Sequence, residues 1–161
     1  MALTNFDLWR LEGITSMPCK FGPEGATKTH LKGAPVVYSS GLLQEAGADP
    51  TTVVGVAAHA GRNAAASGSR SFFLPPDEAV IFVGSLDTSA SEGTGTVVAT
   101  DLGAEYGITK SAQAGATTVN KWYVDKNKTG GSARVKVVEL IDAATTVQGR
   151  VGFIFLPAAK A

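Results

Sequence analysis

The last quarter of the chain contains three apolar runs that are separated by turn residues. The runs cover residues 119–124, 134–141 and 150–156, and they are rich in β-branched and aromatic side chains. This composition and spacing are typical of neighbouring strands in an antiparallel sheet. The sequence therefore predicts an antiparallel meander in which residues 127–131, with their glycines, form a hairpin loop.

The pattern within these runs indicates how they are buried. In the second run Val135 and Val137 share one face, whereas Leu140 has the opposite parity. A β-bulge near Val138 would return Leu140 to the buried face. The third run is apolar on both faces, so it must be covered on both sides, either by its own domain or by a partner subunit.

The composition is that of a turn-rich β protein with a weakly charged surface. The chain has 161 residues, of which 17% are charged and 19 are glycine. This length suits one domain, or a compact body with a small subdomain or arm. Lysine plus arginine and aspartate plus glutamate both number 14, so the formal net charge is zero. This balance argues against nucleic-acid binding and favours a protein that works inside an assembly.

The sequence also bears on targeting. Residues 1–10 contain an early acidic residue and lack the continuous apolar core of a signal peptide. The longest apolar runs, around residues 53–60, are far shorter than the roughly 20 residues of a membrane-spanning helix. We therefore expect a soluble protein that is made in a cytoplasm and has no membrane partner.

Glycine and proline positions divide the chain into three parts. Residues 29–75 predict a small β subdomain, and residues 76–161 predict a small antiparallel β-barrel or sandwich, tulip-like in shape, that ends in the meander. In residues 1–28 the glycines and prolines are too closely spaced for a strand or helix to persist, which predicts an extended N-terminal arm on an all-β body. Two interpretations of this arm stay open: it lays Phe6 and Trp9 onto its own domain, or it orders against another subunit through Trp9.

Local features carry further predictions. Residues 42–46 are expected to form a helical turn that Gly47 ends. Gly55, inside a strand-like run, indicates a bulge or a close approach between backbones. Residues 61–71 are polar and of low complexity, which indicates an exposed loop. Further short strands are expected at residues 79–83, 96–100 and 105–109.

Candidates for a reactive site are few. Cys19 could pair with His30 or His59 as a thiol–imidazole couple, or the three could bind a metal. The sequence offers neither a recognisable catalytic frame nor the short ligand spacing of a zinc site. Four carboxylates fall at expected turns, where an aspartate accepts hydrogen bonds from nearby backbone N–H groups: Asp77, Asp87, Asp101 and Asp125. We therefore expect no enzyme, no catalytic residue, no bound metal and no cofactor.

Two stretches carry a resemblance to a known family. The first is Lys32-Gly-Ala-Pro-Val-Val-Tyr-Ser-Ser-Gly41, followed by Thr52-Val-Val-Gly-Val-Ala57; the second combines residues 122–126, 134–142 and 149–155. Together they resemble the decoration, or cement, proteins of tailed-bacteriophage heads. The resemblance implies a small β protein, often a homotrimer, that binds the outer surface of the expanded capsid in the virion. Its partners would be its own copies and the major capsid protein, whose neighbouring subunits it would hold together.

On this reading the apolar cluster of the arm and the 61–71 loop are the expected contacts with the capsid or with another subunit. The residues are Phe6, Leu8, Trp9, Leu11, Arg62 and Arg70. Two other functions remain open. One is a different phage structural component, such as a head-fibre base or a tail-tube subunit. The other is a carbohydrate-binding β module, which would expose aromatic platforms to a sugar.

Overall fold

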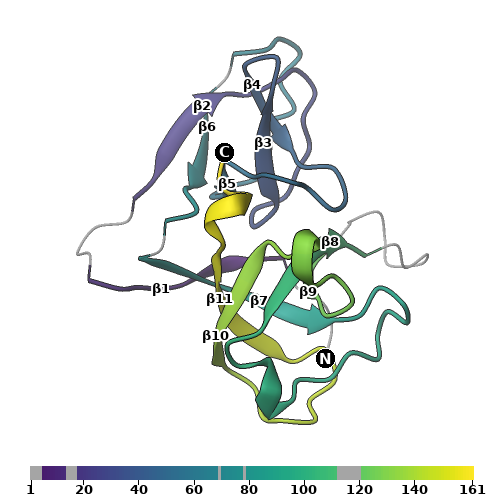
Figure 1. Cartoon of the computed structure of the whole chain (residues 1–161). Helices are drawn as coiled ribbons and strands as arrows, with labels where there is room; N and C mark the ends of the chain where they lie inside the picture. The colour runs from purple at the N-terminus through teal and green to yellow at the C-terminus, as the bar shows by residue number, and fades with distance from the viewer. Residues whose placement is uncertain (1–4, 14–17, 69, 78, 112–120) are drawn as a thin grey trace.

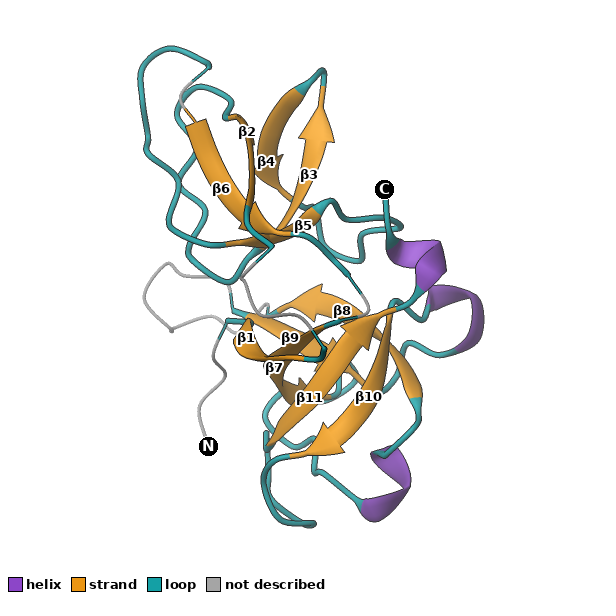
Figure 2. Ribbon diagram, turned by 90° about the vertical axis from the view of Figure 1, so that its left-hand side faces the viewer, coloured by secondary structure: helices purple, strands orange, loops and turns teal. Residues whose placement is uncertain are grey.

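In the part of the chain that the computed structural model describes, eleven β-strands form two sheets that lie one above the other (Figure 1, Figure 2). The structure describes residues 5–13, 18–68, 70–77, 79–111 and 121–161. The strands are β1 (Asp7–Leu11), β2 (Lys20–Pro23), β3 (Pro35–Ser39), β4 (Leu42–Glu45), β5 (Gly55–Ala57), β6 (Arg70–Leu74), β7 (Val80–Asp87), β8 (Glu105–Lys110), β9 (Trp122–Asp125), β10 (Val135–Leu140) and β11 (Arg150–Phe155). Three short 3₁₀ turns accompany them: η1 (Ala99–Asp101), η2 (Gly130–Ser132) and η3 (Pro157–Ala159).

The larger sheet closes into a five-stranded barrel. Its order is β1-β7-β11-β10-β8-β9, and β9 also pairs with β7. The four pairings from β7 to β9 are all antiparallel. An odd number of strands joined in this way leaves the first and last strands running in the same direction, so the closing pair β7–β9 is parallel. The predicted all-β barrel is confirmed.

Part of the predicted C-terminal meander is confirmed. β10 and β11 form an antiparallel pair, and their register shifts between Val137 and Glu139, which makes Val138 the extra residue of a β-bulge. The bulge lies where the parity of the sequence requires it, and Leu140 packs against the barrel core as expected.

The predicted hairpin between the first two runs is wrong. β8 lies between β9 and β10 and is antiparallel to both, so β9 and β10 run in the same direction and are not neighbours. Residues 127–131 therefore lead across β8 rather than around a hairpin, and η2 begins at Gly130 and ends at Ser132. Residues 119 and 120 of the first run lie outside the described residues.

The smaller sheet has the order β2-β6-β5-β3-β4. The prediction of a helical turn at residues 42–46 is wrong, because β4 pairs with β3 in a tight hairpin. Its two loop residues, Ser40 and Gly41, both have positive φ, as a two-residue hairpin of the favoured twist requires. A parallel bridge between Glu24 and Leu43 brings the two edges of this sheet together.

The expected strand at residues 96–100 is also wrong. Only a single bridge, from Thr96 to Val147, forms in this segment. The chain then turns through η1, where the Asp101 carboxylate accepts a hydrogen bond from the backbone N–H of Val98. The strands expected at residues 79–83 and 105–109 are present as β7 and β8.

Gly55 lies where two backbones approach closely, as its position in the sequence indicates. A Cβ atom at this position would stand 2.3 Å from the carbonyl oxygen of Leu74 on β6 and 2.6 Å from the Phe73 ring. We expect Gly55→Ala to lower the free energy of unfolding by about 1–3 kcal/mol, because the two strands would have to separate. Urea unfolding followed by circular dichroism measures this change. Gly47→Ala is the matched control, since an added Cβ there meets no atom within 4 Å.

The structure corrects the prediction of a separate arm at residues 1–28. Residues 7–11 form β1, which pairs with β7 of the barrel, and residues 20–23 form β2, which pairs with β6 of the smaller sheet. Phe6, only 1% exposed, packs edge-on against Phe153 with ring centroids 4.9 Å apart. The described part of this segment is therefore built into both sheets. Of the interpretation that it lays Phe6 and Trp9 onto its own domain, the part that concerns Phe6 is confirmed, while Trp9 is 42% exposed.

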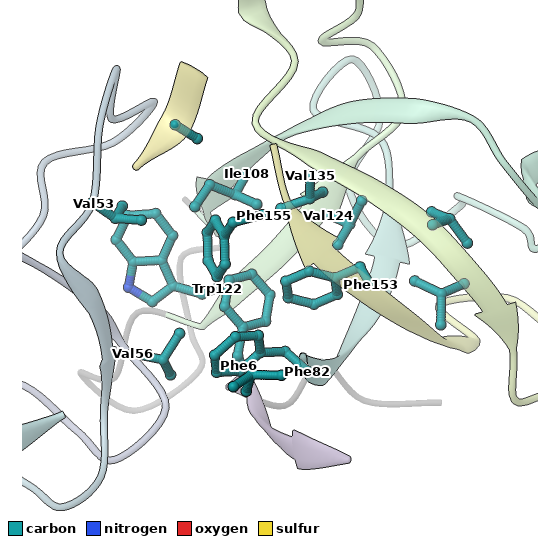
Figure 3. Packing of buried hydrophobic residues seen from close by; sticks show 14 of the residues in the cluster. Phe6, Val53, Val56, Phe82, Ile108, Trp122, Val124, Val135, Phe153 and Phe155 are labelled. Carbon is teal, nitrogen blue, oxygen red and sulfur yellow. The ribbon is translucent and has the colours of Figure 1, made fainter. Parts of the chain in front are cut away.

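One hydrophobic core joins the two sheets. Trp122 of β9 is fully buried, and Figure 3 shows its indole ring between Val53 and Val56 on one side and the aromatic residues of the barrel on the other. Its Nε1 donates to Oε1 of Glu45 on β4, 2.8 Å away. Trp122 is thus part of a barrel strand, but its side chain contacts residues of both sheets.

The end of the chain also connects the two sheets. After β11 the chain turns through η3 and reaches the smaller sheet (Figure 1). There the backbone N–H of Val53 donates to Ala159 O at 2.8 Å, and the N–H of Ala161 donates to Val53 O at 3.0 Å. These bonds hold the last residues against the segment that precedes β5.

Candidate interaction surfaces

Trp9 stands at a β-bulge on the edge strand β1. Leu8 pairs with Phe82 and Arg10 with Ile81, so Trp9 is the extra residue between them. Leu8 and Leu11 are three residues apart and would face opposite sides of a regular strand, but the bulge lets both pack against the core. The indole of Trp9 is left at the surface, 42% exposed.

Polar contacts hold this indole in place. Nε1 of Trp9 donates to Oε2 of Glu139 on β10, 2.9 Å away. The guanidinium of Arg10 lies 3.0 Å from the same carboxylate oxygen, and it also contacts Glu12 at 2.9 Å. An exposed tryptophan that is already ordered loses little conformational entropy when a partner covers it. We call Trp9, Arg10 and Glu139 the Trp9 surface.

The loop at residues 61–68 lies on the smaller sheet, and none of its residues is buried. It is attached to residues 24–30 by backbone hydrogen bonds. The N–H of Arg62 donates to Oε1 of Glu24 at 2.8 Å, while the Arg62 side chain is exposed. Arg70 is the first residue of β6, opposite Pro23, and its side chain lies outside the described part of the chain.

The residues predicted as one interface do not form one surface. Phe6 is part of the protein's own core, so its predicted contact with another subunit is corrected: the ring is already covered by Phe153. Leu8 and Leu11 are half-buried against that core. Trp9 is exposed on β1, whereas Arg62 is exposed on a loop of the other sheet.

A second aromatic surface was not predicted from the sequence. Phe21 on β2 and Phe72 on β6 are directly opposite one another, with ring centroids 6.0 Å apart, and Phe21 is 54% exposed. His59 contacts the Phe72 ring edge-on at 5.7 Å, and its Nε2 accepts the Phe72 N–H at 3.0 Å. The apolar run at residues 72–74 indicates a strand that contains Phe72, but the strand opposite it was hidden among glycines and prolines.

The four aspartates expected at turns accept backbone N–H groups, which confirms their predicted role. Asp87 is fully buried and accepts four hydrogen bonds, each of 2.8 Å, from the N–H groups of Thr88, Gly93 and Gly95 and from the side-chain amide of Gln148. Its carboxylate thereby orders the loop that follows β7.

The carboxylate of Asp101 accepts a backbone hydrogen bond in its turn and also forms an ion pair with Lys126. Nζ of Lys126 lies 2.9 Å from Oδ1 of Asp101, and the hydroxyl of Tyr106 donates to the same oxygen at 2.7 Å. Burial and the neighbouring carboxylate raise the pKa of Tyr106 well above its usual range, so the hydroxyl keeps its proton. The cluster joins η1, β8 and the end of β9.

The three residues considered for a reactive site, Cys19, His30 and His59, lie in different environments. Cys19 is exposed, and its Sγ lies 3.8 Å from Lys20 O. Nδ1 of His59 lies 2.7 Å from Ala60 O, while His30 is buried. Among the described residues, no group of three or more His, Cys, Asp or Glu side chains is arranged to hold a metal. In the same part of the chain, no helix has the length and apolar character needed to cross a membrane.

Comparison with known proteins adds no relative: neither a scan against protein-family models nor a search of curated proteins finds a match for this chain.

Proposed function

We propose that this chain is a structural protein of a tailed-bacteriophage head, which binds the outer surface of the expanded capsid and stabilises it by holding neighbouring major capsid protein subunits together. The proposal takes the chain to act as a homotrimer on the virion surface. Binding only the mature shell would stabilise that shell by mass action, and three linked copies would add multivalency.

The observation that carries the proposal is the Trp9 surface. A tryptophan that is 42% exposed and fixed by Glu139 has the properties of an interface hot spot: a large apolar area, a polar rim and little entropy left to lose. The all-β body and the resemblance of its two stretches to decoration proteins support the same function.

The test is co-sedimentation of the purified protein with undecorated, expanded heads of the phage that carries this chain. We expect saturable binding, and we expect Trp9→Ala to weaken it about 30-fold, which corresponds to about 2 kcal/mol at a hot spot. Tyr38→Ala is the matched control, since Tyr38 is also an exposed aromatic residue, 45% exposed, but lies on β3 of the smaller sheet; its binding should equal that of the wild type.

The outcomes separate the competing functions. Failure of the wild-type protein to bind heads contradicts the proposal, and binding to tails or to a glycan array instead would favour the other functions considered above. Full-affinity binding by the Trp9→Ala protein would retain the capsid role but remove the Trp9 surface from it.

A further inference from the structure

The imidazole of His30 is buried and, among the described residues, forms no side-chain hydrogen bond. Only 3% of the residue is exposed, and neither ring nitrogen has a hydrogen-bond partner among the described residues. A buried imidazole without partners resists protonation, because the charged form would lose its hydration.

The loop at residues 61–68 covers this ring. A Cβ atom at Gly61 would lie 3.0 Å from Nδ1 of His30 and 2.5 Å from the carbonyl oxygen of Lys28, so the loop backbone lies directly against the imidazole. The N–H of Gly61 also donates to His30 O at 2.7 Å. Moving the loop away would therefore expose His30 to water.

The loop can separate from the sheet at a small cost in apolar contact. None of residues 61–68 is buried, and what attaches them is a short row of hydrogen bonds. Asn63 N–H donates to Lys28 O at 3.0 Å, and Gly68 N–H donates to Glu24 O at 2.9 Å. Segments attached in this way open at free energies well below that of global unfolding.

The charged groups around His30 come from several elements. Glu24, after β2, and Glu45, on β4, favour a positive charge on the ring, whereas His59, after β5, disfavours it. Lys28 and Lys110 line a polar cleft of about 410 Å³ beside His30. Glu24 is itself buried; its Oε1 accepts the Arg62 N–H, and its Oε2 has no partner among the described residues. Burial is the largest influence on the imidazole, and it lowers the pKa of His30.

We propose that residues 61–68 form an acid-sensitive lid over His30, which opens as the medium becomes acidic because only the open state lets the imidazole take up a proton. Above the ordinary histidine pKa of about 6.5 both states are neutral at His30, and the lid stays closed. Below this pH the imidazole binds a proton in the open state but stays neutral in the closed state. The equilibrium constant for opening therefore rises by up to about tenfold for each pH unit. The equilibrium constant stops rising below the lowered pKa of the closed state, because His30 is then protonated in both states.

Amide hydrogen exchange of the whole chain, measured by NMR between pH 7.5 and pH 5, tests this lid. The amides of Gly61 and Asn63 report on it directly, since both donate to residues beneath the loop. After correction for intrinsic exchange rates, we expect their protection to be constant above about pH 6.5 and to fall by up to about tenfold per unit below it. The Val54 amide, which donates to Val36 O, should stay more strongly protected than Gly61 and Asn63 at every pH, because the lid opens at a lower free energy than the sheet.

Two variants assign the effect to its residue. His30→Gln should remove the pH dependence at Gly61 and Asn63, while His59→Gln should keep it. If His30→Gln does not fold, the comparison of Gly61 with Val54 in the wild type still decides. The lid is overturned by constant protection at Gly61 throughout the range, by protection at Gly61 that equals that at Val54 at every pH, or by a fall that persists in His30→Gln.

Discussion

Replacing Phe153 with alanine is expected to lower the free energy of unfolding by about 4 kcal/mol, a large part of the stability of a domain of this size. Phe153 is fully buried at the centre of the barrel. Its ring contacts Phe6, Phe82 and Phe155 at centroid distances of 4.9, 6.0 and 5.7 Å. The loss combines the transfer of the ring out of water with a cavity that the three aromatic neighbours, on β7, on β11 and just before β1, cannot close.

Chemical denaturation followed by tryptophan fluorescence measures this loss, since Trp122 lies in the same core. Ile154→Ala is the matched control: it lies next to Phe153 on β11 but is only partly buried, so we expect a loss of about 1–2 kcal/mol. Equal losses for the two variants would mean that the aromatic cluster is not the centre of stability.

Asp87→Ala is expected to cost about 3–5 kcal/mol, although it removes a polar side chain. The carboxylate accepts four hydrogen bonds from groups that have little access to water, and alanine would leave those donors without an acceptor. We also expect the loop after β7 to lose its order, which would appear as reduced hydrogen-exchange protection at Gly93 and Gly95.

Asp77→Ala provides the comparison for Asp87. Asp77 holds its turn in the same way, but it is exposed and its carboxylate accepts the N–H of Ala79. Its loss should cost about 1 kcal/mol. A similar small cost at Asp87 would contradict the view that this buried carboxylate organises the loop.

Side-chain parity allowed parts of the barrel to be predicted. The bulge at Val138 follows from the positions of Val137 and Leu140, because one buried face requires an extra residue between them. The neighbours of each strand do not follow from parity. β8 inserts between β9 and β10 through pairings that are distant in sequence, and no local pattern records such pairings.

Predictions from local sequence were wrong where the same residues are compatible with two local structures. Gly41 and Gly47 flank a short apolar segment, and this pattern fits both a helical turn and a tight hairpin; pairing with β3 decides for the strand β4. In residues 20–23 the glycine and proline argued against a strand. The edge position of β2 tolerates both, since an edge strand leaves backbone groups unpaired.

The candidate interaction residues lie in different environments. Trp9 is exposed, whereas Phe6, from the same apolar cluster of the sequence, is part of the core. Hydrophobicity alone does not separate a ring that covers the core from one that faces solvent. The bulge between Leu8 and Arg10 makes the difference, and bulges of this kind are set by the partner strand.

The hydrogen bonds between Val53 and the last residues of the chain bear on how a partner would be bound. The residues after β11 are hydrogen-bonded to the smaller sheet, and Trp122 packs against residues of both sheets. These contacts resist rotation of one sheet relative to the other. A partner large enough to reach both Trp9 on β1 and Phe21 on β2 would therefore meet them at one fixed separation. Once the first contact has formed, the second would do so at a high effective concentration, so avidity would come from the rigidity of a single chain.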